Sequence, residues 1–171
     1  MNKNLVLTGM MGVGKTTLGK RLAKELSYNF VDVDKLIEIK EGCSINHIFK
    51  KKSEKYFRKL ECNISLVELK KKNTVISLGG GAFLNKSIRQ AVKNSALSFW
   101  LDVSVYKLIN RLKKNKKRPL LYNKNLSEMI NKIYLDRKTT YNEADFRIRC
   151  NFLKPEKIVN KILKLYEKSG N

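Results

Sequence analysis

A glycine-rich segment followed by a lysine and two threonines carries the strongest chemical signal in the sequence. Residues 9–16 read Gly-Met-Met-Gly-Val-Gly-Lys-Thr and match the phosphate-binding pattern G-x-x-x-x-G-K-[ST], between a strand-like run and a helical pattern. Glycines let the backbone curl so that successive N–H groups face an anion, and the following helix N-terminus adds partial positive charge. Lys15 should reach the β- and γ-phosphates of ATP, and the Thr16 hydroxyl should bind Mg²⁺ directly. The predicted ATP-binding residues of this segment are Gly12, Val13, Gly14, Lys15, Thr16 and Thr17.

Two carboxylates lie at the end of the second strand-like run. Asp32 and Asp34 are two residues apart, so at the end of a strand they would point to the same face, at the edge where parallel sheets bind ligands. One carboxylate, Asp32, could hold Mg²⁺ through water while Asp34 accepts a hydrogen bond from an attacking hydroxyl. The alternative is that Asp34 only caps a helix starting at Lys35.

Three consecutive glycines, Gly79, Gly80 and Gly81, follow the apolar run at 75–78. Glycines in a row suit a place where the backbone passes close to a ligand, although a plain turn would also use them. No aspartate follows this run, where a second magnesium-binding carboxylate would be expected. The outer shell of Mg²⁺ would then be shared by Ser77 and Asp32.

The elements that must position these residues alternate between strand and helix, which is typical of an α/β fold with a parallel sheet. Strands are predicted at 5–7, 30–33, 75–78, 97–101 and 146–149. Helices are predicted at 16–26, 35–40, 86–93, 105–113 and 126–143, in one long stretch from 45 to 71, and from Pro155 onward. The one segment with loop-like character and no periodicity is 115–125. At 171 residues we expect one domain, and we expect it to act as a monomer.

A formal charge of +22 raises the alternative of a nucleic-acid-binding ATPase. The lysines are spread over nearly every predicted helix and are not interleaved with aromatic residues, as a base-stacking platform would require. The sequence has no apolar stretch of about 20 residues and no signal-peptide pattern at its start, so we expect neither membrane insertion nor export. Cys43, Cys62 and Cys150 form no C-x-x-C pair and are expected to be reduced thiols in the cytoplasm.

Taken together, these sequence motifs resemble those of the shikimate kinase family along essentially the whole chain. The similarity lies in 9–16, in Phe30-Val31-Asp32-Val33-Asp34 with Ile37-Glu38, in Gly42-Cys43-Ser44-Ile45 with Ile48-Phe49, in Phe57-Arg58 with Glu61, in 79–81, in Arg118-Pro119-Leu120-Leu121, and in Arg137 with Tyr141. The resemblance implies a five-stranded parallel sheet of order 2-3-1-4-5. It also implies a substrate-binding helical region at 35–72 and a lid at 115–125.

The resemblance also implies an activity, the ATP- and Mg²⁺-dependent phosphorylation of shikimate in the pathway to aromatic amino acids. The shikimate 3-hydroxyl would lie on Asp34, its carboxylate on Arg58 and Arg137, and its ring against Gly80. Arg118 would meet the phosphates from the lid, and Arg111 would lie beside adenine. Lys15, Asp34 and Arg118 would be the catalytic residues.

One part of the family pattern is missing. Family members often place an adenine-contacting arginine shortly before the last helix, where this chain has Leu153, Lys154 and Pro155. His47 is expected to be structural, because phosphoryl transfer needs no imidazole here. Gluconate and nucleoside-monophosphate kinases share the phosphate-binding loop and remain as alternatives. The set of Asp34, Arg58, 79–81 and Arg137 argues against both.

Overall fold

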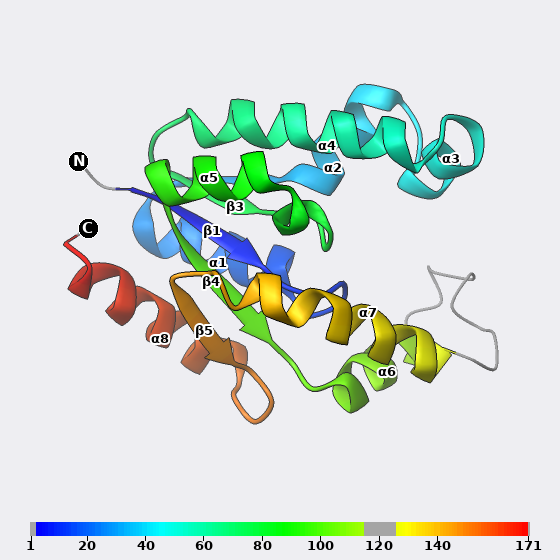
Figure 1. Cartoon of the computed structure of the whole chain (residues 1–171). Coiled ribbons are helices and arrows are strands. Elements are labelled where there is room, and N and C mark those ends of the chain that lie inside the picture. Colours follow the sequence, from blue (N-terminus) through cyan, green and yellow to red (C-terminus); the bar gives the residue numbers. More distant parts are fainter. Residues whose placement is uncertain (1–2, 115–125, 171) are drawn as a thin grey trace.

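A five-stranded parallel sheet forms the centre of the computed structural model, which describes residues 3–114 and 126–170 (Figure 1). The strands are β1 (Asn4–Thr8), β2 (Asn29–Asp32), β3 (Thr74–Ser77), β4 (Ala96–Asp102) and β5 (Phe146–Arg149). Their spatial order is β2-β3-β1-β4-β5, as predicted. Every residue of β1, β3 and β4 is buried, because helices cover both faces of a parallel sheet.

Helices flank the sheet on both sides (Figure 1). They are α1 (Lys15–Leu26), α2 (Val33–Glu41), α3 (Ile45–Lys51), α4 (Glu54–Leu69), α5 (Lys86–Ser95), α6 (Val105–Lys114), α7 (Leu126–Tyr141) and α8 (Pro155–Lys168), with a 3₁₀ turn η1 (Ala82–Leu84). α1 packs against α8, and α4 packs against α5. Pro155 occupies the first turn of α8, where its missing N–H costs no hydrogen bond.

The single helical stretch predicted from 45 to 71 is wrong, because two helices occupy it. α3 ends at Lys51 and α4 begins at Glu54. Ser53 interrupts the helix with φ 92° and ψ 158°, and its Oγ accepts a hydrogen bond from the Tyr56 N–H at 3.4 Å. An N-terminal serine cap satisfies one of the free N–H groups of a new helix, so α4 begins as a separate helix.

The second strand also ends earlier than predicted. β2 stops at Asp32, and Val33 is the first residue of α2. The Asp32 side chain accepts a hydrogen bond from the Lys35 N–H at 3.3 Å, so Asp32 and not Asp34 caps this helix. The expectation that both carboxylates share one face of a strand is therefore wrong.

The carboxyl ends of the three strands that precede the predicted site residues meet at one edge of the sheet. Asp32 is paired in register with Ser77, and Ser77 is paired with Leu7 just before the glycine-rich loop. This register places the loop, the end of β2 and the glycines after β3 beside one another. Ligands of open α/β sheets bind at this edge.

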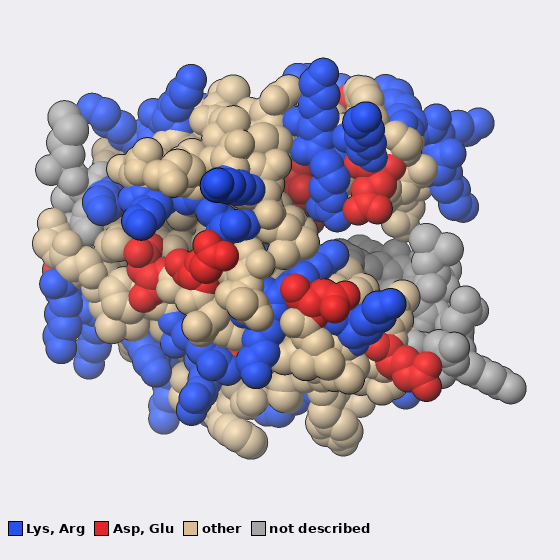
Figure 2. Space-filling view, viewed as in Figure 1, with Lys and Arg blue, Asp and Glu red and all other residues tan. Residues whose placement is uncertain are grey.

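Among the described residues, none of the helices is long and apolar enough to cross a bilayer. The three cysteines are free, with Cys150 buried and Cys43 and Cys62 partly exposed. Lys and Arg side chains are spread over the face in view and have acidic side chains between them, rather than gathering in one patch (Figure 2).

Candidate active site

A cavity of about 820 Å³ opens at this edge of the sheet. The phosphate-binding loop and α1 form its floor, α2, α3 and α4 line one side, and α7 contributes the opposite side. Most of the sequence-predicted residues that the structure describes lie in its lining: Gly12, Gly14, Lys15, Thr16, Thr17, Asp32, Asp34, Arg58, Ser77, Gly80, Gly81 and Arg137.

The glycine-rich loop has the backbone that its sequence predicts. Gly9, Gly12 and Gly14 have φ angles of 132°, 77° and 102°, in a region that side chains disfavour. Lys15 is 9% exposed, and its Nζ donates hydrogen bonds to the carbonyl oxygens of Gly9 at 2.8 Å and Met10 at 3.0 Å. The ammonium is thus fixed over the loop at the N-terminus of α1, where an anion is favoured.

Thr16, Asp32 and Ser77 form the part of the cavity that suits a magnesium ion. The Thr16 hydroxyl donates to Asp32 Oδ2 at 2.6 Å, and Ser77 is the register partner of Asp32. No group of three or more His, Cys, Asp or Glu side chains suited to a metal occurs among the described residues. One hydroxyl and one carboxylate nevertheless fit Mg²⁺, because this ion usually keeps several waters and takes its other ligands from substrate phosphates.

Asp34 lies in the first turn of α2 and faces Gly79, across the cavity from α7. A Cβ added to Gly79 would lie 2.6 Å from Asp34 Oδ1 and 2.4 Å from Glu61 Oε1. A side chain at Gly79 would therefore displace the carboxylates of Asp34 and Glu61. This contact brings Asp34 into the site by a route that the strand argument did not foresee.

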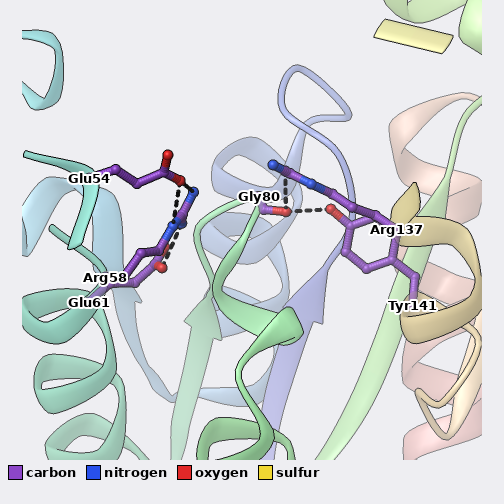
Figure 3. Close-up of polar contacts among 6 residues, drawn as sticks. All are labelled: Glu54, Arg58, Glu61, Gly80, Arg137 and Tyr141. Atoms are coloured by element: carbon purple, nitrogen blue, oxygen red, sulfur yellow. Dashed lines mark hydrogen bonds and ion pairs between the residues drawn. The ribbon is translucent and has the colours of Figure 1, made fainter. Parts of the chain in front are cut away.

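Arg58 is held between two glutamates on its own helix (Figure 3). Its guanidinium donates to Glu54 Oε1 at 3.2 and 3.1 Å and to Glu61 Oε2 at 2.8 Å. Although burial opposes the charged form of Arg58, the carboxylates of Glu61 and Glu54 outweigh it and raise the Arg58 pKa. The guanidinium therefore stays charged and keeps a fixed direction at the cavity wall.

Glu61 is buried, and burial raises its pKa even though the Arg58 guanidinium acts in the opposite direction. The negative charge of Asp34 adds to the rise. The Oε1 atom of Glu61 has no hydrogen-bond partner within the described part of the chain. A buried carboxylate atom left without a partner is costly, so this oxygen is a candidate to accept a hydrogen bond from a ligand or water in the cavity.

Arg137 lies opposite Arg58, on α7 (Figure 3). Its Nη1 donates to the Gly80 carbonyl oxygen at 2.9 Å, and the Tyr141 hydroxyl donates to the same oxygen. Two guanidinium groups thus face the cavity from two sides, with the three glycines between them. Paired guanidinium groups are well suited to bind a carboxylate.

Three of the predicted residues that the structure describes, Gly79, Arg111 and Val13, are not in the cavity lining. The Arg111 side chain is exposed and donates to the Val13 carbonyl oxygen at 3.2 Å, so it contacts the loop without lining the cavity. The Val13 side chain is buried in the core. Arg118 and the predicted lid at 115–125 lie outside the described residues. His47 is exposed, and its backbone N–H donates to the Ser44 hydroxyl at the start of α3.

Reasoning from individual residues assigned no site role to Glu54, Glu61 or Tyr141. Glu54 holds Arg58, and the Tyr141 hydroxyl shares the Gly80 carbonyl with Arg137. Both pairs are four residues apart on a helix, a spacing that places side chains side by side. That spacing was the available signal, but it is too common on helices to indicate a site by itself.

Comparisons with known proteins agree with this geometry. The family model described as shikimate kinase matches residues 11–167. A shikimate kinase from Sulfurihydrogenibium sp. (strain YO3AOP1) is 42% identical over 161 residues, covering 94% of this chain and 96% of that protein. The structure of a shikimate kinase from Acinetobacter baumannii in complex with shikimate aligns with a TM-score of 0.91 at 32% identity, covering 98% of this chain and 94% of that one. A gluconokinase from Sinorhizobium meliloti 1021 aligns with a TM-score of 0.58 at 14% identity, covering 98% of this chain and 93% of that one, which shows a shared fold alone.

Proposed function

The chain belongs to the shikimate kinase family, and on this premise we propose that it transfers the γ-phosphate of ATP to the 3-hydroxyl of shikimate. The observation that carries the proposal is the placement of two guanidinium groups, Arg58 and Arg137, on either side of the glycines beside Asp34. A small acceptor with a carboxylate and a hydroxyl fits this arrangement. Gluconate also carries a carboxylate, but the gluconokinase similarity extends only to the fold.

The residues at the acceptor end of the cavity have separate roles in this proposal. Arg58 and Arg137 bind the substrate carboxylate through charge-assisted hydrogen bonds. Asp34 accepts the proton of the attacking hydroxyl as the new oxygen–phosphorus bond forms and ADP leaves. Gly79, Gly80 and Gly81 let the ring approach the backbone. Helices α2, α3 and α4, which together cover most of the predicted region 35–72, form the acceptor-binding region.

The nucleotide end uses the glycine-rich loop. Its N–H groups and Lys15 hold the β- and γ-phosphates and stabilise negative charge as it shifts during transfer. Thr16 would hold Mg²⁺ directly, with Asp32 and Ser77 acting through water, and the ion would neutralise charge on the phosphates. Arg118, in the proposed lid, adds positive charge at the transferred group, and Arg111 lies near the base.

The remaining assignments follow from the same premise. We propose a single domain that works as a monomer in the cytoplasm, with ATP and shikimate as its small-molecule partners. The spread of basic side chains over the face in Figure 2 gives no single track for a nucleic acid, so we do not assign a nucleic-acid-dependent activity.

The test is an ADP-release assay in which the purified protein receives ATP, Mg²⁺ and one acceptor at a time. Shikimate should support release, whereas gluconate and nucleoside monophosphates should leave it at the level seen with no acceptor. A parallel sample with DNA or RNA should show no stimulation. Release supported equally by gluconate, or stimulated by nucleic acid, would overturn the assignment.

A further inference from the structure

Two side chains of α7 donate to a single acceptor, the carbonyl oxygen of Gly80 (Figure 3). Arg137 and Tyr141 are one helical turn apart and therefore lie on the same side of α7. Arg137 Nη1 is 2.9 Å from the oxygen, and the Tyr141 hydroxyl donates to it as well. A carbonyl oxygen has two acceptor positions, so both donors can bind at once.

Tyr141 is fixed in its place. It is fully buried, and its ring packs against Trp100 with the ring centroids 5.9 Å apart. Its hydroxyl also lies 3.9 Å from the Met10 sulfur, in the phosphate-binding loop. Burial raises the pKa of the phenol, which keeps its proton available for donation. Among the partners given by the structure, the Gly80 carbonyl is the strong acceptor for this proton.

The Gly80 peptide lies between the phosphate-binding loop and Arg137. A Cβ added to Gly80 would be 3.4 Å from the Met11 nitrogen and 3.7 Å from Arg137 Nη1. Gly80 therefore lies next to both the phosphate-binding loop and the guanidinium of Arg137. A hydroxyl that holds the Gly80 carbonyl also sets where the Arg137 guanidinium can rest.

We propose that Tyr141 is a positioning residue for acceptor binding, acting through the Gly80 carbonyl on Arg137. The inference rests on the proposed function, in which Arg137 binds the acceptor carboxylate. To do so, the guanidinium must direct donors away from the protein. Tyr141 keeps the Gly80 carbonyl hydrogen-bonded. Arg137 can therefore turn toward the substrate carboxylate without leaving the Gly80 oxygen without a hydrogen bond. Without the hydroxyl, Arg137 is the only side-chain donor to this carbonyl among the described residues, and carboxylate binding competes with it.

The test compares Tyr141→Phe with Tyr134→Phe. Both variants lose one phenolic hydroxyl from α7, but Tyr134 donates to Asp102 at 3.0 Å and not to Gly80. Calorimetric titration with shikimate should give a Kd roughly 5- to 30-fold higher for Tyr141→Phe than for the parent. Tyr134→Phe should stay within about 2-fold of the parent. For Tyr141→Phe, kcat at saturating shikimate and KM for ATP should change by less than about 3-fold, because the loss concerns ground-state binding.

A double-variant cycle separates this role from a purely structural one. If Tyr141 acts through Arg137, then adding Tyr141→Phe to Arg137→Ala should weaken shikimate binding by less than about 2-fold. Thermal melting of each variant shows whether it is folded at the titration temperature. An unchanged Kd for folded Tyr141→Phe, or an equal loss with and without Arg137, would overturn the inference alone. Failure of the parent to bind shikimate would overturn the proposed function and this inference with it.

Discussion

The guanidinium of Arg58 lies against Gly81, in the space that a side chain at this position would fill. A Cβ added to Gly81 would be 2.5 Å from Arg58 Nη1 and 2.8 Å from its Cζ. Real Cβ atoms do not approach other heavy atoms so closely, so a side chain at Gly81 must displace the guanidinium. The third glycine therefore determines where Arg58 can rest, which a turn glycine would not do.

Replacing Gly81 by alanine should therefore weaken acceptor binding more than folding. We expect Gly81→Ala to raise KM for shikimate roughly 10-fold or more, because the displaced guanidinium loses a charge-assisted contact of about 1.5–3 kcal/mol. Steady-state kinetics and thermal melting measure the two effects. Asn160→Ala, at an exposed position on α8 outside the cavity lining, is the control. An unchanged KM for shikimate in Gly81→Ala would contradict the assignment of Arg58.

The two ends of the acceptor site should respond differently to substitution. Asp34→Asn keeps the shape but removes the negative charge that accepts the proton, so its main effect should be on kcat. Arg58→Ala removes a contact present in both the ground and transition states, so KM should rise roughly 10- to 150-fold. Normal turnover by Asp34→Asn, or unchanged shikimate affinity in Arg58→Ala, would show that these roles are wrong.

Lys15 is predicted to be essential for phosphoryl transfer and to contribute little to the stability of the fold. Lys15→Met loses the ammonium that would meet the phosphates, so kcat/KM should fall by at least roughly 100-fold. The hydrogen bonds to the Gly9 and Met10 carbonyls are lost too, but the loop keeps its glycine backbone. Lys20→Met, an exposed position on the same helix, is the matched control and should be as active as the parent. Near-normal turnover by Lys15→Met would contradict the role of the loop.

Ser53 combines a helix cap with an unfavourable backbone. Its φ of 92° and ψ of 158° belong to a region that is essentially restricted to glycine, with a cost of about 1–3 kcal/mol for other residues. Glycine at an N-cap is only a few tenths of a kcal/mol worse than serine. Ser53→Gly should therefore raise the free energy of unfolding by about 1 kcal/mol, or Tm by about 2–4 °C.

A second serine cap provides the control for the expected stability change of Ser53→Gly. Ser44 caps α3 through its hydroxyl, but its φ of −69° carries no such strain. Ser44→Gly should therefore be slightly less stable than the parent. Denaturant titration of the parent and both variants measures these differences in the free energy of unfolding. If Ser53→Gly is also less stable than the parent, the strain at Ser53 is not a cost to folding.

The three cysteines should differ in reactivity toward thiol reagents. Burial, followed by the negative charge of Asp102, raises the pKa of Cys150 to about 11. At pH 8, Cys43 and Cys62 should therefore react with a maleimide well before Cys150, as mass spectrometry of peptides would show. Labelling in denaturant should remove the difference. Because the folded pKa lies above the unfolded one, the stability contribution of the neutral thiol is complete below about pH 8.5 and is lost as pH rises toward 11.

The sequence by itself determined the strands, their parallel arrangement and the phosphate-binding loop. These features depend on local signals: short runs rich in apolar residues suit buried parallel strands, and the loop needs glycines at fixed positions before a helix. The sheet order and the roles of Arg58 and Arg137 came from resemblance to a family. The observed sheet confirms the order, while the roles of the site residues remain proposals.

Only the tertiary structure decided how the polar side chains meet. It placed Asp34 on α2 rather than on a strand, divided the predicted helix at 45–71 at Ser53, and brought Tyr141 and Arg137 to the Gly80 carbonyl. The contact at the Gly80 carbonyl does not follow from a local pattern, because Gly80 and α7 are far apart in sequence and meet at the sheet edge. A glycine in the sequence shows that the backbone has room, and only the folded chain shows that a carboxylate or a guanidinium occupies it.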